Sequence, residues 1–273
     1  MRFTAAAMAI GLSLALPAAP AWAEHSDTAA AMADALAQDN RAQDRARDSF
    51  RHPAETLDFF QVEPGMTVVD YMPATGWYTR VIVPYLGEQG RYIGLNPAPS
   101  SAQTEGFRNY VTGLTDKFRE AAPGWNLTGA PVAAYTSDEV PDALQGQVDR
   151  ALIFREMHNL FRSGALHPEL TRIRALLKDD GMLGIVQHRA KPWASGDYTD
   201  GNKGYLRQSD VIGLVEAHGF ELVGTSEVNA NPVDSADHPQ GVWELPPVMR
   251  SKNEALRPIG ESDRMTLLFR KRK

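Results

Sequence analysis

Two short stretches of the chain place histidine close to arginine at the end of an apolar run. The first, "FREMHN", contains Arg155, Glu156 and His158, and the second, "QHRA", contains His188 and Arg189. Histidine can exchange a proton near neutral pH, and arginine can bind an oxyanion through two parallel hydrogen bonds. We therefore predict a catalytic site made of His158, His188, Arg155 and Glu156, with His158 as the first candidate base and Arg155 or Arg189 binding an anionic group. The alternative, that Arg155 and Glu156 pair with neighbours while His158 caps a turn, stays open.

A third stretch, "VVDYMPATGWYTR", is typical of a ligand-binding turn between a strand and a helix. An apolar run ends in Asp70, and Gly76 leads into a helical pattern, whose first N–H groups are free to bind a ligand. Met72 and Ala74 stand where loops of this kind usually carry glycine. If Ala74 must adopt positive φ, its methyl group costs about 1 kcal/mol and weakens ligand binding about tenfold. From these residues alone, an ordinary strand-to-helix turn is a nearly equal alternative.

Further acidic and histidine side chains occur in "DSADHPQGVW", which contains Asp234, Asp237 and His238. Together with His158 and His188, these side chains offer enough oxygen and nitrogen atoms to bind a metal ion. Their spacing matches no strong ligand motif, so caps and turns are the better interpretation, and we predict no metal site.

The elements that must position these residues alternate along the chain. Seven apolar stretches are typical of strands: "MTVVDY", "GRYIGLN", "APVAAYT", "VDRALIFREM", "MLGIVQHRA", "ELVGTSEV" and "DRMTLLFRK". Helical spacing lies between them, for example in residues 100–122 and in "HPELTRIRALLKDDG". Strands that alternate with helices and contain few polar residues indicate an α/β fold with a mostly parallel sheet and helices on both faces. Ligands of such sheets bind beyond the carboxyl ends of the strands.

Four segments lie outside this alternation. Residues 1–23 have the basic start, apolar run and A-x-A ending of a secretory signal, so we expect cleavage after Ala23 and a periplasmic or secreted chain, with an uncleaved anchor as the minor alternative. Residues 24–50 are predicted to begin loosely and to continue as a surface helix. The domain of residues 51–273 then contains a Gly-rich loop at 191–205 and an insertion at 229–261. We predict that this insertion is an ordered lid, because it holds Trp243 and several polar side chains.

The composition excludes several classes of protein. The chain has no cysteine, so neither disulfides nor thiolate metal sites contribute. A net charge of -6 and a pI near 5.7 argue against binding to nucleic acid. We expect a small-molecule substrate and no stable membrane insertion after cleavage of the signal.

Six motifs together resemble a family of exported bacterial proteins described as predicted methyltransferases, within the class I S-adenosylmethionine-dependent methyltransferases. These motifs are "RHPAETLDFF", "PGMTVVDYMPATGWYT", "FREMHN", "HRA", "NANPVDSADHPQGVWELPP" and "IGESDRMTLLF", and the resemblance covers about residues 48 to 270. It implies a Rossmann-like seven-stranded sheet whose last strand is antiparallel and inserts beside the fifth. It also implies S-adenosylmethionine as the cofactor, bound by Asp70, Pro73, Ala74, Thr75, Gly76 and Asn96. An acid normally occupies the place of Asn96 at the ribose, so we expect weaker binding rather than none.

Three functions are compatible with these residues. The first is an S-adenosylmethionine-dependent methyltransferase acting on a small molecule or an envelope component. The second is a non-catalytic ligand-binding protein on the same fold, since fold and function are separable. The third and weakest is a hydrolase that uses the histidine and aspartate cluster with a metal ion.

Overall fold

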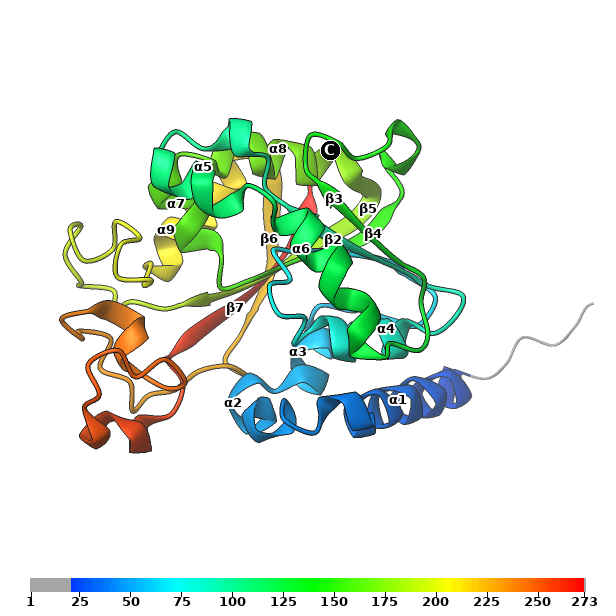
Figure 1. Cartoon of the computed structure of the whole chain (residues 1–273), viewed down its shortest axis with the longest axis horizontal. Coiled ribbons are helices and arrows are strands. Elements are labelled where there is room, and N and C mark those ends of the chain that lie inside the picture. Colours follow the sequence, from blue (N-terminus) through cyan, green and yellow to red (C-terminus); the bar gives the residue numbers. More distant parts are fainter. Residues whose placement is uncertain (1–20, 273) are drawn as a thin grey trace, which may run out of the picture.

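The computed structural model describes residues 21–272, and its centre is a single seven-stranded sheet (Figure 1). The order of strands across the sheet is β3-β2-β1-β4-β5-β7-β6. The strands are β1 Thr67–Tyr71, β2 Arg91–Asn96, β3 Val132–Thr136, β4 Val148–Phe154, β5 Leu177–His188, β6 Phe220–Ser226 and β7 Arg264–Lys271. Strands β1 to β5 pair in parallel, whereas β7 lies antiparallel between β5 and β6. The predicted Rossmann-like sheet with an antiparallel last strand beside the fifth is therefore confirmed.

Helices cover both faces of the sheet, and two apolar clusters form the core. Alternate residues of a strand point to opposite faces, so Val69 and Tyr71 of β1 join one cluster and Val68 joins the other. The first cluster packs under α5 Glu105–Val111, α7 Met157–Ser163, α8 Leu166–Leu176 and α9 Gln208–Ala217. The second packs under α1 Ala21–Ala37, α3 Pro53–Phe59, α4 Thr79–Leu86 and α6 Leu114–Ala121. This packing fixes the carboxyl ends of β1, β2, β4 and β5 along one edge.

Several helix predictions differ from the structure. The single helical stretch predicted for residues 100–122 is two helices, α5 and α6. Gly113 separates them, because its φ of 78° is not helical and the chain changes direction there. Helix α7 was not predicted, and it begins directly after the polar stretch that follows β4. The helix predicted to close at Gly181 ends at Leu176, and β5 already begins at Leu177.

The N-terminal segment begins with a helix rather than loosely. Helix α1 packs against α4, and Met32 and Ala35 are buried there. The stretch after it, predicted as one surface helix, consists of short 3-10 turns at Asp39–Arg41 and Arg45–Arg47 followed by α2 Asp48–Arg51. Residues 1–20 lie outside the described part of the chain, so the signal remains a prediction. Among the described residues, no helix is both long and apolar enough to cross a membrane.

One buried carboxylate of the insertion between β6 and β7 binds to two other segments of the domain. Asp234 accepts hydrogen bonds from Tyr205 Oη at 2.9 Å and from the backbone N–H of Asp263 at 2.8 Å. Its other oxygen lies 2.9 Å from Nε2 of His238. These bonds join the insertion to the Gly-rich loop and to the start of β7. Two short 3-10 helices, Gly241–Glu244 and Glu254–Ile259, are its only regular elements in the described structure.

Candidate functional site: two adjoining pockets

The loop after β1 and the end of β2 form one wall of a pocket of about 380 Å³, which we call the loop pocket. Helix α6 and the turn after it form the opposite wall. The lining residues are Met72, Pro73, Ala74, Thr75, Asn96, Tyr110, Leu114, Lys117, Phe118, Ala121, Trp125 and Glu156. A volume of this size lies within the range of small-molecule sites. Predicted residues Pro73, Ala74, Thr75 and Asn96 are therefore brought together.

The backbone of this loop takes the left-handed conformation at three positions. Met72 has φ 54°, Ala74 has φ 49° and Gly76 has φ 75°. A side chain at Gly76 would also collide with Trp125, since an added Cβ would lie 2.5 Å from its ring. Gly76 is thus required by conformation and by space. Because the folded loop already has positive φ at Ala74, the conformational cost of about 1 kcal/mol falls on folding. This cost would weaken ligand binding, as we predicted from the sequence, only if the loop changed conformation on binding.

Asp70 and Gly76 lie outside the lining of the loop pocket, although the resemblance implied contacts to the cofactor. The Asp70 carboxylate is buried beneath the loop, where it accepts a hydrogen bond of 2.8 Å from Tyr92 Oη. Thr79 Oγ1 lies 2.7 Å from the same hydroxyl. Burial raises the pKa of Asp70 to about 7, against the opposite effect of the Tyr92 hydrogen bond. Through Tyr92, Asp70 therefore connects the end of β1 to Thr79 at the start of α4.

Asn96 stands at the end of β2 with its side chain in the wall of the loop pocket. Its Nδ2 lies 3.3 Å from Thr115 Oγ1, and that hydroxyl lies 3.0 Å from Thr136 Oγ1. No described residue donates a hydrogen bond to the amide oxygen. Oδ1 is thus the atom through which Asn96 can accept a bond from a ligand hydroxyl.

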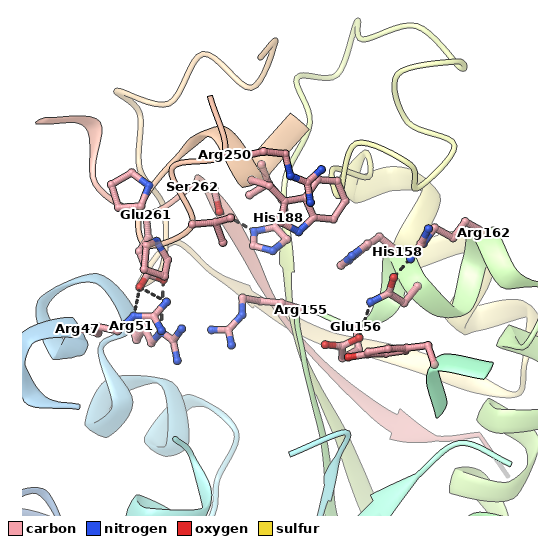
Figure 2. A pocket seen from close by; sticks show the side chains of 17 residues that line it. Arg47, Arg51, Arg155, Glu156, His158, Arg162, His188, Arg250, Glu261 and Ser262 are labelled. Carbon is pink, nitrogen blue, oxygen red and sulfur yellow. Dashed lines mark hydrogen bonds and ion pairs between the residues drawn. The ribbon is translucent and has the colours of Figure 1, made fainter. Parts of the chain in front are cut away.

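A second pocket of about 460 Å³ adjoins the first, and we call it the cationic pocket (Figure 2). Its walls come from the N-terminal segment, the ends of β4 and β5, helix α7 and the insertion. The lining residues are Arg47, Arg51, Tyr110, Arg155, Glu156, His158, Asn159, Arg162, His188, Val242, Trp243, Pro246, Pro247, Val248, Arg250, Glu261 and Ser262. All four predicted catalytic residues lie here, and Tyr110 and Glu156 line both pockets.

The two arginines predicted to bind an anion have different surroundings. Arg189 is bound by carboxylates, at 3.0 Å to Asp263 and 2.7 Å to Glu227, and does not line the cationic pocket. Arg155 does line it, and among the described residues its guanidinium has neither a hydrogen bond nor an ion pair. Figure 2 shows its side chain reaching across the floor of the pocket toward Arg51. The backbone of Arg155 has φ 64°, a conformation that non-glycine residues hold mainly where the surroundings enforce it.

The two histidines face one another across the pocket, with ring centroids 5.9 Å apart. Burial lowers the pKa of His158 to about 4, and Arg162 and Arg155 add to this effect. Burial and the neighbouring His158 likewise hold the pKa of His188 well below its usual range. Nδ1 of His188 lies 2.6 Å from Ser262 Oγ, which orients the ring. Both imidazoles are therefore neutral at neutral pH, and both are weak bases.

Glu156 stands between the two pockets and is held by the first turn of α7. Asn159 Nδ2 donates a hydrogen bond of 2.7 Å to its carboxylate. Burial nevertheless raises the pKa of Glu156 to about 7. The carboxyl group is thus divided between its two protonation states near neutral pH. His158 does not cap a turn, because it lies within α7 and its ring packs edge-on against Trp243 at 6.0 Å.

Sequence reasoning missed the residues by which the N-terminal segment closes the cationic pocket. Glu261 of the insertion pairs with Arg47 at 2.6 Å, with Arg51 at 3.3 Å and with the buried Arg264 at 3.2 Å. Burial alone would raise the pKa of Glu261, but Arg51, Arg264 and their neighbours lower it to about 2. This ion-pair cluster joins the insertion to the N-terminal segment. The only signal in the sequence was the density of arginine in "DNRAQDRARDSFR".

The cluster of acids and histidines in the insertion does not assemble around a shared point. His238 pairs with Asp234, and neither of them lines the pocket that holds His158 and His188. Among the described residues, no three histidine or acidic side chains are arranged to hold a metal ion.

Comparison with known proteins places the fold. No protein-family model matches the chain, and no curated protein matches it. Among solved structures, it is similar to a SAM-dependent methyltransferase from Aquifex aeolicus, with a TM-score of 0.51 and 18% identity over 67% of this chain and 87% of that one. It is also similar to the cyclase SpnF, with a TM-score of 0.54 and 13% identity over 91% of this chain and 94% of that one.

Strand order, the antiparallel β7 and these similarities define the fold as that of the class I S-adenosylmethionine-dependent methyltransferases. Identities this low show the fold alone. SpnF illustrates that a protein of this fold can be an enzyme of another kind.

Proposed function

We propose that the chain is an S-adenosylmethionine-dependent methyltransferase that acts on a small molecule. The observation that carries the proposal is the pair of adjoining pockets, which meet at Tyr110 and Glu156 beyond the ends of the strands. Methyl transfer needs the cofactor and the acceptor in separate sites that share one boundary. The loop pocket supplies the cofactor side, and the cationic pocket supplies the acceptor side.

The residues of the loop pocket suit the cofactor. Asn96 offers its amide oxygen to the ribose hydroxyls, and Leu114, Phe118 and Trp125 offer apolar surface to the adenine. The left-handed residues Met72 and Ala74 line the pocket, where the amino-acid moiety of the cofactor would lie. When bound there, the cofactor supplies an electrophilic methyl group on a sulfonium.

The residues of the cationic pocket orient the acceptor and exclude water. His158 and His188 are neutral and can each accept a hydrogen bond or a proton from an acceptor group. Trp243 and the prolines of the insertion cover the pocket from one side. The low pKa of both imidazoles makes them suited to acceptors that need little help in losing a proton.

The placement of Asn96 gives the test of the cofactor side. Asn96→Asp introduces a charged acceptor at the ribose and should tighten binding of S-adenosylhomocysteine about tenfold by calorimetry. Asn253→Asp is the matched control, because Asn253 is exposed and caps a 3-10 turn away from both pockets. Equal affinity of Asn96→Asp and the parent chain would contradict the assignment of the ribose site.

A non-catalytic binding protein, or an enzyme of another kind on this fold, is the second candidate. It is favoured by Asn96 in place of an acid and by the weak basicity of both histidines. Saturable binding of S-adenosylhomocysteine favours the methyltransferase, whereas absence of binding to this ligand favours the second candidate.

We further propose that the chain is exported and that its signal ends at Ala23. Cleavage there would keep most of helix α1 and all residues of both pockets in the mature chain. N-terminal sequencing of the protein recovered from a periplasmic fraction tests this, and an intact Met1 in the cytoplasmic fraction would contradict it.

A further inference from the structure

The cationic pocket holds an excess of positive charge in a chain whose net charge is -6. Five arginines and two glutamates line it, so three positive charges remain uncompensated even with both carboxylates ionised. One of those carboxylates, Glu261, is already shared among Arg47, Arg51 and Arg264. The lining of the pocket therefore carries a net positive charge, which favours binding of an anionic ligand.

Arg155 is the centre of this imbalance. Its guanidinium is only partly exposed and unpaired among the described residues, and it faces Arg51. Besides burial, the charge of Arg155 is the main factor that lowers the pKa of Arg51, which means that the two cations repel one another. Guanidinium groups bind carboxylates through two parallel hydrogen bonds, and an anion between them would relieve the repulsion.

Apolar and aromatic side chains form part of the pocket wall on the side of the insertion, next to Arg250 and Glu261. Trp243, Val242 and Pro246 line this side, and Tyr110 lines the side toward the loop pocket. Arg250 lies over the Trp243 ring at 4.9 Å, which holds the indole in place. This part of the wall therefore offers apolar contact to a ring next to the arginines.

We propose that the cationic pocket selects an acceptor with a carboxylate on a flat apolar body, and that Arg155 binds the carboxylate. The inference rests on the proposed function, because it identifies the substrate class of the acceptor side. The cofactor carries a carboxylate of its own, but Arg155 does not line the loop pocket. The anion at Arg155 is therefore assigned to the acceptor.

The test uses benzoate as the probe and benzamide as its neutral counterpart, each titrated into the full mature chain by calorimetry. Benzoate should bind at least tenfold more tightly than benzamide. Arg155→Met should weaken benzoate binding about tenfold to hundredfold, and Arg155→Lys by less, because it keeps the charge. Arg270→Met is the matched control, since Arg270 is an exposed arginine paired with Glu221 outside the pocket. Arg155→Met should unfold close to the parent temperature, because the lost attraction between Arg155 and Glu156 and Glu261 is offset by relief of its repulsion of Arg51.

S-adenosylhomocysteine separates the two sources of a carboxylate. Its affinity should stay within about twofold of the parent in Arg155→Met. Loss of that affinity with benzoate binding retained would assign Arg155 to the cofactor and overturn the inference. Equal binding of benzoate and benzamide, or no saturable benzoate heat, would overturn it as well while leaving the methyltransferase proposal standing. Benzoate binding without any binding of S-adenosylhomocysteine would instead remove the proposed function and keep the anion site.

Discussion

Ala74→Gly should stabilise the protein, which is the opposite of what the same change does at an ordinary alanine. Ala74 is exposed and adopts φ 49°, so removing its methyl group loses no buried contact. The left-handed conformation costs a non-glycine residue about 1 to 2 kcal/mol. Glycine avoids this cost but lowers the stability by about 0.4 to 1 kcal/mol, because it increases the conformational entropy of the unfolded chain. The net gain is about 0.5 to 1 kcal/mol, or about 1 to 4 °C in Tm for a domain of this size.

Differential scanning calorimetry of Ala74→Gly beside Ala42→Gly measures this effect. Ala42 is also exposed but has φ -51°, so glycine there should lower the stability by about 0.5 to 1 kcal/mol. The affinity for S-adenosylhomocysteine should be the same in Ala74→Gly and the parent chain, because the cost belongs to folding. If both variants lose stability equally, the left-handed assignment of this loop is refuted.

Two further predictions concern buried acids. Asp70 has a folded pKa of about 7 against an ordinary value of 3.8, so its stabilising contribution is complete below pH 3.8 and is lost as the pH rises through 7. Asp70→Asn should therefore raise Tm by a few degrees at pH 8 and have little effect at pH 4, and a larger gain at pH 4 would contradict the sign. Glu261 has a folded pKa of about 2 against 4.5, so its contribution is present above pH 4.5 and is lost as the pH falls toward 2. Glu261→Gln should cost about 3 to 5 kcal/mol at pH 7 in urea unfolding, and equal losses at pH 7 and pH 2.5 would argue against the ion-pair cluster.

The regular elements were readable from the sequence, because their burial follows a simple period. Each predicted strand exists, since strands buried on both faces contain nearly continuous apolar residues. The order of the strands was not readable from periodicity and came from the resemblance. Helix α7 was missed because it has only seven residues and begins directly after the polar stretch that follows β4.

The candidate site was predictable only where its residues stand at strand ends. His158, His188, Arg155 and Glu156 meet because parallel strands end at the same edge. Arg47 and Arg51 reach the pocket through Glu261, more than 200 positions away in the chain, and no local pattern reports such a contact. The charged stretch around them resembled a solvated surface helix, whereas Arg51 is buried. The motif likewise did not predict that the Asp70 side chain lies outside the loop pocket, because its orientation depends on the hydrogen bond from Tyr92.

The most direct test of the account is a calorimetric titration of the mature chain with S-adenosylmethionine and S-adenosylhomocysteine, paired with thermal unfolding at the same ligand concentrations. We predict saturable binding of both ligands, weakened by the missing charge at Asn96, together with a rise in Tm that grows with ligand concentration. No binding heat and no rise in Tm at about 1 mM of either ligand would contradict the assignment of the loop pocket to this cofactor.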